Sequence, residues 1–152
     1  MGVDMHMYME CLGEDGKWNA LLAMVPSLVS PGAFVLKNLV DYRNYELFQI
    51  MGDHFDAGLP NNVSDEVKSI HDTYSGCCYG EKSVRLTKLK KYYKAHKTVR
   101  IDYDCDWDVE EAHELDSPLK ALLKDIKAYI RIIDSFGLLE DENIRLVYWF
   151  DR

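Results

Sequence analysis

Residues 3–11 alternate between apolar and polar side chains, and this period of two constrains the fold more than any other feature of the chain. The apolar positions are Val3, Met5, Met7, Met9 and Cys11, and the polar ones are Asp4, His6, Tyr8 and Glu10. Because side chains alternate across a β-strand, the stretch is predicted to be a strand with one apolar core face. Its other face carries four functional groups, which suits binding of a metal, a phosphate or a sugar hydroxyl and equally suits an ordinary solvated sheet face.

The rest of the chain is predicted to form four helices and further strands, the last of them near residue 150. Asp15-Gly16 predicts a hairpin turn into a second strand over 18–25, and 83–86 is a candidate short strand. Apolar residues at helical spacing predict four helices, over 41–51, 64–74, 88–96 and from the cap Ser117 to Gly137. Thr87 is the expected cap of the third. The apolar segment 144–150 is predicted to be a final, central strand.

These elements predict one α+β domain over residues 1–152. The expected architecture is a small, mostly antiparallel sheet that contains the N- and C-terminal strands and packs with about four helices. At 152 residues the chain is long enough for a single core, and 47% hydrophobic with 29% charged residues is an ordinary globular composition. The net charge of −8 argues against binding of genomic nucleic acid, yet it leaves room for a small anionic ligand in a local basic pocket.

Opposite charges occupy two adjacent segments. Residues 82–100 hold eight Lys and Arg without an acid, and residues 102–116 hold eight Asp and Glu without a Lys or Arg. Two interpretations stay open: a pair of solvated, partly neutralising faces, or a basic block that receives an anionic ligand or partner. The alternating Asp residues of 102–108 do not match a calcium-binding EF-hand loop, and they predict an edge strand instead.

Two short motifs resemble those of dinuclear metallophosphatases. Asp4-Met5-His6 matches the opening D-x-H of that class and Gly52-Asp53 its later Gly-Asp, but its remaining His motifs are missing. The other histidines and the neighbouring Cys77 and Cys78 match no metal-ligand or nucleophile spacing. We therefore expect no metal or cofactor, and no catalytic residue is assigned.

Targeting features point to the cytoplasm. No Cys-x-x-Cys pair or secreted disulfide pattern is present, and Asp4, His6 and Glu10 interrupt any apolar core of a signal peptide. The uncharged run 18–36 contains Asn19, Pro26 and Pro31-Gly32, which disfavours a membrane span.

Several segments resemble a family of small phage and prophage proteins that open with Met-Gly-Cys-Asp-Ile-His-x-Tyr-x-Glu. Here residues 1–10 read Met-Gly-Val-Asp-Met-His-Met-Tyr-Met-Glu, and further matches lie at 15–18, 43–48, 58–60, 64–67 and 144–151. Val3 replaces the family's Cys, and 79–83 read Tyr-Gly-Glu-Lys-Ser where the family has Asp-Gly-His-Ser. The family's histidine is thus missing, which weakens an enzymatic interpretation and leaves a binding one intact.

The resemblance, by analogy with small phage proteins that counter bacterial immunity, implies a sponge that sequesters a cyclic oligonucleotide signal without cleaving it. Such a protein acts in the cytoplasm of the infected host, and a pocket shared between subunits predicts a homo-oligomer. The candidate ligand-binding residues are Asp4, His6, Tyr8, Arg43, Tyr45, Tyr79, Lys82, Ser83 and Arg85. Two alternatives stay open, namely a metal-dependent phosphoesterase that uses Asp4 and His6, and a protein–protein inhibitor of a host factor.

Overall fold

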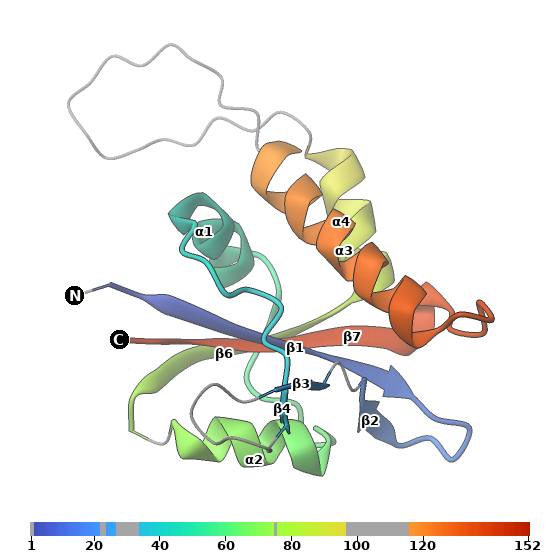
Figure 1. Cartoon of the computed structure of the whole chain (residues 1–152). Coiled ribbons are helices and arrows are strands. Elements are labelled where there is room, and N and C mark those ends of the chain that lie inside the picture. Colours follow the sequence, from blue (N-terminus) through green and yellow to red (C-terminus); the bar gives the residue numbers. More distant parts are fainter. Residues whose placement is uncertain (1, 22–23, 27–33, 75, 97–115) are drawn as a thin grey trace.

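The computed structural model describes residues 2–21, 24–26, 34–74, 76–96 and 116–152. Its elements in chain order are β1 (Asp4–Leu12), β2 (Trp18–Ala20), β3 (Met24–Pro26), β4 (Phe34–Leu36), α1 (Tyr45–Asp53), β5 (Asp56–Ala57), α2 (Asp65–Thr73), β6 (Cys78–Arg85), α3 (Leu86–Ala95), α4 (Asp116–Ile133), a short 3-10 turn (Asp141–Asn143) and β7 (Ile144–Asp151). Figure 1 shows the single α+β arrangement that the sequence predicted.

Five strands form the main sheet in the order β2-β1-β7-β6-β5, with every neighbouring pair antiparallel. The final strand β7 is central, as its apolar sequence predicted, and every one of its residues from Ile144 to Phe150 is buried. It pairs with β1 from Asp4↔Asp151 to Cys11↔Ile144, so the two terminal strands lie side by side. β3 and β4 form a separate two-stranded sheet.

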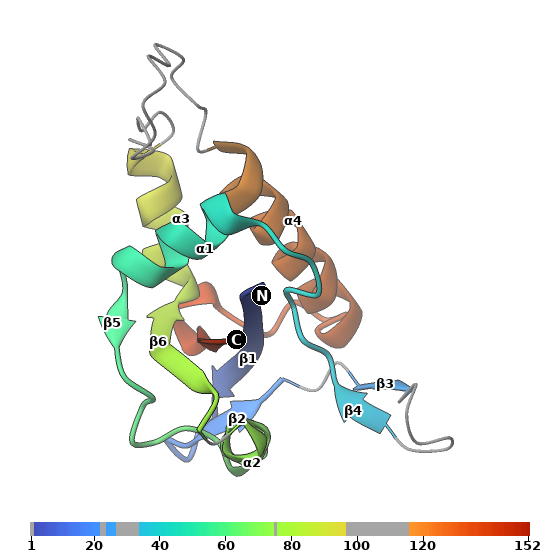
Figure 2. The same cartoon turned by 90° about the vertical axis from the view of Figure 1, so that its left-hand side faces the viewer.

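Helices cover both faces of the main sheet. In Figure 1, α1, α3 and α4 lie above it and α2 lies below; Figure 2 shows the same layers from the side. The upper core contains the apolar face of β1, with Met5, Met7 and Met9 in one cluster with Leu146 and Tyr148. A smaller core lies between α2 and the sheet, where Val67 packs with Tyr8, Val147 and Trp149.

The polar face of β1 is therefore largely covered, and Glu10 is fully buried. The Glu10 carboxylate accepts hydrogen bonds from the Ser64 backbone N–H (2.6 Å) and from Arg145 Nε (2.7 Å). Arg145 also donates to the side chain of Asn62 and lies over the Trp18 ring at 4.1 Å. Since Ser64 is the N-cap of α2, this buried ion pair attaches the start of α2 to the sheet.

Some predicted boundaries were wrong. The second strand ends at Ala20, and Met24–Pro26 pairs with β4 instead of β1. Thr87 is not a cap, because β6 continues to Arg85 and α3 begins at Leu86. The predicted edge strand at 102–108 lies outside the described residues. Among the helices that are described, none is long and apolar enough to cross a bilayer.

Candidate metal centre

Helix α2 places His71 against the face of the sheet that α2 covers. Ser64 caps the helix, Asp65 and Glu66 lie in its first turn where the helix dipole favours acids, and His71 lies in its last turn. The His71 ring stands edge-on to Trp149 of the central strand, with ring centroids 5.0 Å apart. Its side chain is 16% exposed, so the imidazole is held in a mostly buried position at the boundary between α2 and the sheet.

A β-bulge in β6 supplies the other two groups. Tyr79 pairs with Phe150 and Lys82 with Tyr148, so three steps along β6 match two steps along β7. In a regular strand, residues three apart point to opposite faces, and the extra residue allows Cys78 and Glu81 to share the α2 face. Gly80 adopts φ 63° within this bulge, a conformation that other residues rarely take.

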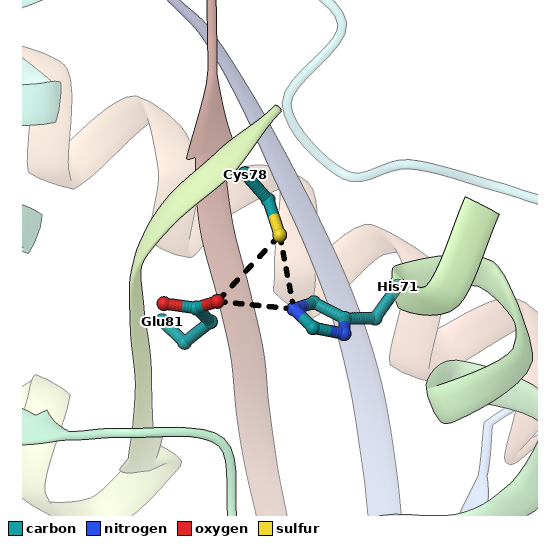
Figure 3. Close-up of side chains that lie close together, drawn as sticks. All are labelled: His71, Cys78 and Glu81. Atoms are coloured by element: carbon teal, nitrogen blue, oxygen red, sulfur yellow. Dashed lines mark hydrogen bonds and ion pairs between the residues drawn. The ribbon is translucent and has the colours of Figure 1, made fainter. Parts of the chain in front are cut away.

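The three side chains converge on one point, as Figure 3 shows. Cys78 Sγ lies 3.3 Å from His71 Nε2, Glu81 Oε1 lies 3.2 Å from the same nitrogen, and the Sγ–Oε1 distance is 3.5 Å. Tetrahedral zinc, with bonds of about 2.0–2.3 Å, keeps neighbouring ligand atoms roughly 3.3–3.6 Å apart. The observed triangle is therefore close to one face of a zinc coordination tetrahedron.

The same geometry disfavours a nucleophilic Cys–His–Glu triad. A catalytic histidine uses one ring nitrogen for the nucleophile and the other for the orienting carboxylate. Here both partners face Nε2. Burial, reinforced by the hydrogen bond and charge of Glu81, raises the pKa of the Cys78 thiol, whereas an activated nucleophile needs a lowered one. A shared cation explains the convergence better than a shared proton.

A carboxylate stands behind the histidine, as is usual for metal-binding imidazoles. His71 Nδ1 lies 3.6 Å from Asp72 Oδ1, and the other oxygen of Asp72 accepts a hydrogen bond from Lys68. The Lys68 ammonium holds the pKa of Asp72 below its usual value, with a smaller contribution from His71. Asp72 is thus an anion near His71 Nδ1, at ion-pair distance and not at hydrogen-bond distance.

An aromatic and polar wall borders the cluster on the same face of the sheet. His6 is opposite Trp149 in the β1–β7 register, and Cys78 is opposite Asp151 in the β6–β7 register. His6 Nε2 lies 3.2 Å from Asp151 Oδ2, and its ring lies 4.3 Å from that of Tyr74. Within the described part of the chain, the buried side-chain polar atoms without a hydrogen-bond partner are His6 Nε2, His71 Nδ1 and Trp149 Nε1. All three belong to this region, which therefore borders the smaller core with polar groups that have no hydrogen-bond partner.

The predicted ligand-binding residues are distributed over several places. His6 and Tyr8 lie on the face of the sheet that α2 covers, where burial raises the pKa of the Tyr8 hydroxyl strongly. Asp4 forms a two-point ion pair with Arg43 at 2.6 and 3.0 Å. Tyr45 and Tyr79 line an open cleft of about 270 Å³ on the α1 side, with Phe48 and Phe150 among its other walls.

The remaining three predicted residues lie away from that cleft and contribute to the fold. Lys82 donates to the Phe55 carbonyl (3.1 Å), and Ser83 pairs with Asp56 across β5 and β6. The Arg85 guanidinium lies 5.6 Å from the Trp18 ring centroid. The structure thus brings Tyr45 and Tyr79 together, and Asp4 with Arg43, but does not assemble all nine residues into one site.

Sequence reasoning missed His71, Cys78 and Glu81 as a group. The expectation of no metal site rested on the linear spacing of ligands, and a His-x6-Cys-x2-Glu pattern is not a recognised one. The available signal was Gly80 inside a strand-like segment, which marks a bulge.

Comparisons with protein-family models, with curated proteins and with solved structures found no match to this chain.

Proposed function

We propose that this protein binds a transition-metal ion, Zn²⁺ in the first instance, through His71 Nε2, Cys78 Sγ and Glu81 Oε1. The observation that carries the proposal is the convergence of three chemically different ligand atoms at 3.2–3.5 Å from one another. Nitrogen, thiolate and carboxylate ligands together suit zinc, since calcium and magnesium prefer oxygen alone.

A three-ligand set leaves one tetrahedral position for water or a ligand. Structural zinc sites usually use four protein ligands, whereas catalytic sites use three and keep an open position. The proposed centre belongs to the second kind. A bound Zn²⁺ supplies a Lewis acid and lowers the pKa of a coordinated water. The His6–Asp151 pair on the neighbouring strands provides groups that can exchange a proton near such a water.

The proposal is tested by titrating the purified, chelator-treated protein with Zn²⁺ and Co²⁺. We expect one ion per chain and, with Co²⁺, a thiolate charge-transfer absorption. The variants His71→Ala, Cys78→Ser and Glu81→Gln should each weaken binding by about a hundredfold or more. Cys77→Ser is the matched control, because it removes an adjacent but exposed thiol. Absence of saturable binding, or equal effects of Cys77→Ser and Cys78→Ser, would contradict the proposal.

A second candidate is the sequestration of a cyclic oligonucleotide, which the aromatic cleft favours. Tyr45 is 58% and Tyr79 39% exposed at its walls, and Arg152 lies 5.2 Å from the Tyr79 ring. Exposed tyrosine faces with arginine nearby suit a nucleobase and its phosphate. The cleft volume of about 270 Å³ is below the usual range of small-molecule pockets, so a cyclic oligonucleotide needs a second copy of the chain.

The two candidates are separated by one experiment with a panel of cyclic di- and trinucleotides. Intact nucleotide recovered from the protein, with binding weakened by Tyr79→Ala and unaffected by Cys78→Ser, supports sequestration at the cleft. Cleaved nucleotide, with activity lost on chelation and in Cys78→Ser, supports a metal-dependent phosphoesterase. If the protein binds zinc but neither binds nor cleaves any nucleotide of the panel, the first proposal stands and the second is excluded.

A further inference from the structure

A groove with an apolar floor is lined by residues of α3 and α4, two helices that contact each other on the same side of the sheet (Figure 1). Its volume is about 690 Å³. The floor includes Leu86 of α3 and Ile126 of α4, both buried, and Leu123 and Ile130 are half-buried along it. This α3–α4 groove lies on the opposite side of the sheet from the proposed metal centre, so the two sites are independent.

The charge of the α3–α4 groove opposes that of the whole chain. The chain has a net charge of −8, yet five of the groove residues are basic and one, Asp141, is acidic. Asp141 is already paired with Lys90. The other four cations, Lys120, Lys124, Lys127 and Arg131, belong to α4.

These four residues form a basic ridge along α4. Their spacing of four, three and four residues places them on neighbouring positions of one helix face, over about 16 Å of helix length. Like charges at these spacings destabilise a helix. Elsewhere Arg43, Lys68 and Lys88 have acidic partners. Within the described ranges, no ion pair involves Lys124, Lys127 or Arg131.

We propose that the α3–α4 groove binds an acidic amphipathic peptide segment of another protein. Apolar side chains of such a helix enter the groove between Leu123 and Ile130, and its carboxylates face the basic ridge. A small anion would use only one or two of the cations. A nucleic acid would match the cations but not the apolar floor, because its outer surface is a phosphate backbone.

The test uses a fluorescein-labelled synthetic peptide of 18 residues with Leu at helical a and d positions and Glu on both flanks. A scrambled peptide of identical composition is the peptide control. We expect anisotropy titrations to give an affinity about tenfold higher for the amphipathic peptide than for the scrambled one. The double charge reversal Lys124→Glu with Lys127→Glu should lower the affinity for the amphipathic peptide by about tenfold or more.

The matched protein control reverses Lys91 and Lys94 to Glu, which makes the same charge change at exposed residues of α3 outside the groove. It should retain binding of the amphipathic peptide. Ile130→Asn should lower the affinity for the amphipathic peptide and leave the affinity for the scrambled peptide unchanged. This result would distinguish binding in an apolar groove from binding to a basic surface alone.

Three results would overturn the proposal. One is equal affinity for the two peptides, and another is tighter binding of a single-stranded RNA of equal charge. The third concerns the acids of this chain at 102–108, which lie outside the described residues. If peptide binding is seen only after those four Asp residues are changed to Asn, the groove is occupied by the chain itself and not by a partner.

Discussion

Cys78 and Glu10 illustrate how far a single residue can be understood from its neighbours in the chain. The alternation around Glu10 correctly predicted its strand and face, but not that a fully buried carboxylate would bind Arg145 and the cap of α2. Those partners are 135 and 54 positions away, and no local pattern encodes them. Cys78 carried no signal either, because its partner His71 comes from helix α2 and its partner Glu81 lies beyond a bulge in β6.

Metal affinity should rise with pH because Cys78 must lose its proton to become a ligand. Burial raises the pKa of the free thiol, so the thiol is protonated at neutral pH and each binding event releases that proton. Below the thiol pKa we expect the apparent Zn²⁺ affinity to rise by about tenfold per pH unit from this group. Calorimetry in buffers of different ionisation enthalpy measures the protons released. On binding Zn²⁺, the Cys77→Ser variant should release as many protons as the parent protein, and the Cys78→Ser variant about one proton fewer.

Glu10→Gln should destabilise the fold strongly. The substitution keeps the shape of the side chain and leaves the buried Arg145 guanidinium without its anion. Loss of one partner of a buried pair costs about 3–5 kcal/mol, which urea unfolding measures directly. The matched control is Asp4→Asn, which removes the exposed partner of Arg43 and should change stability little. A similar midpoint for both variants would show that the Glu10–Arg145 pair does not anchor α2.

At the scale of elements, sequence patterns predicted the types well and the irregularities poorly. The alternation of β1, the helical apolar stripe of α4, the apolar run of β7 and the Ser64 cap of α2 were all sufficient to identify those elements. The bulge in β6 was not predicted, because a register shift depends on the partner strand and not on β6 alone. Ordinary strand alternation turns Cys78 toward α2 and Tyr79 toward the aromatic cleft, and the bulge that follows lets Glu81 share the α2 face with Cys78.

Gly80→Ala should impair the bulge and with it the metal centre. Gly80 has φ 63°, and an added Cβ would lie 3.2 Å from Cδ2 of Phe150. We expect a loss of about 1–3 kcal/mol in stability and weaker Zn²⁺ binding, since Glu81 follows directly. Gly52→Ala is the control, because a Cβ there meets Phe150 at an ordinary 3.9 Å. Unchanged zinc affinity in a folded Gly80→Ala protein would contradict this role of the bulge.

At the scale of the molecule, sequence patterns of strands and helices predicted one α+β domain, and the two terminal strands do lie in its sheet. They did not predict that both faces of the sheet would be covered, which depends on the placement of α2 below and of three helices above (Figure 1). The proposed metal centre joins α2 to β6. A bound ion should therefore stabilise the packing of α2 against the sheet.

Zn²⁺ should therefore raise the thermal midpoint of unfolding. A ligand at a hundred times its Kd that binds only the folded state stabilises it by about 2.7 kcal/mol, or roughly 5–10 °C for a domain of this size. Differential scanning fluorimetry with and without chelator measures the shift. Cys78→Ser should abolish it and Cys77→Ser retain it, and an equal shift in Cys78→Ser would place the stabilising ion elsewhere.

The central position of β7 has a consequence for synthesis on the ribosome. Before β7 emerges, β1 has only β2 as a neighbour in the sheet, and β6 has only β5. Two isolated strand pairs of this kind are at best marginally stable in water. Since β7 follows the other four strands in the chain, the nascent protein must keep its methionine-rich first strand from aggregating until the last strand joins the two halves.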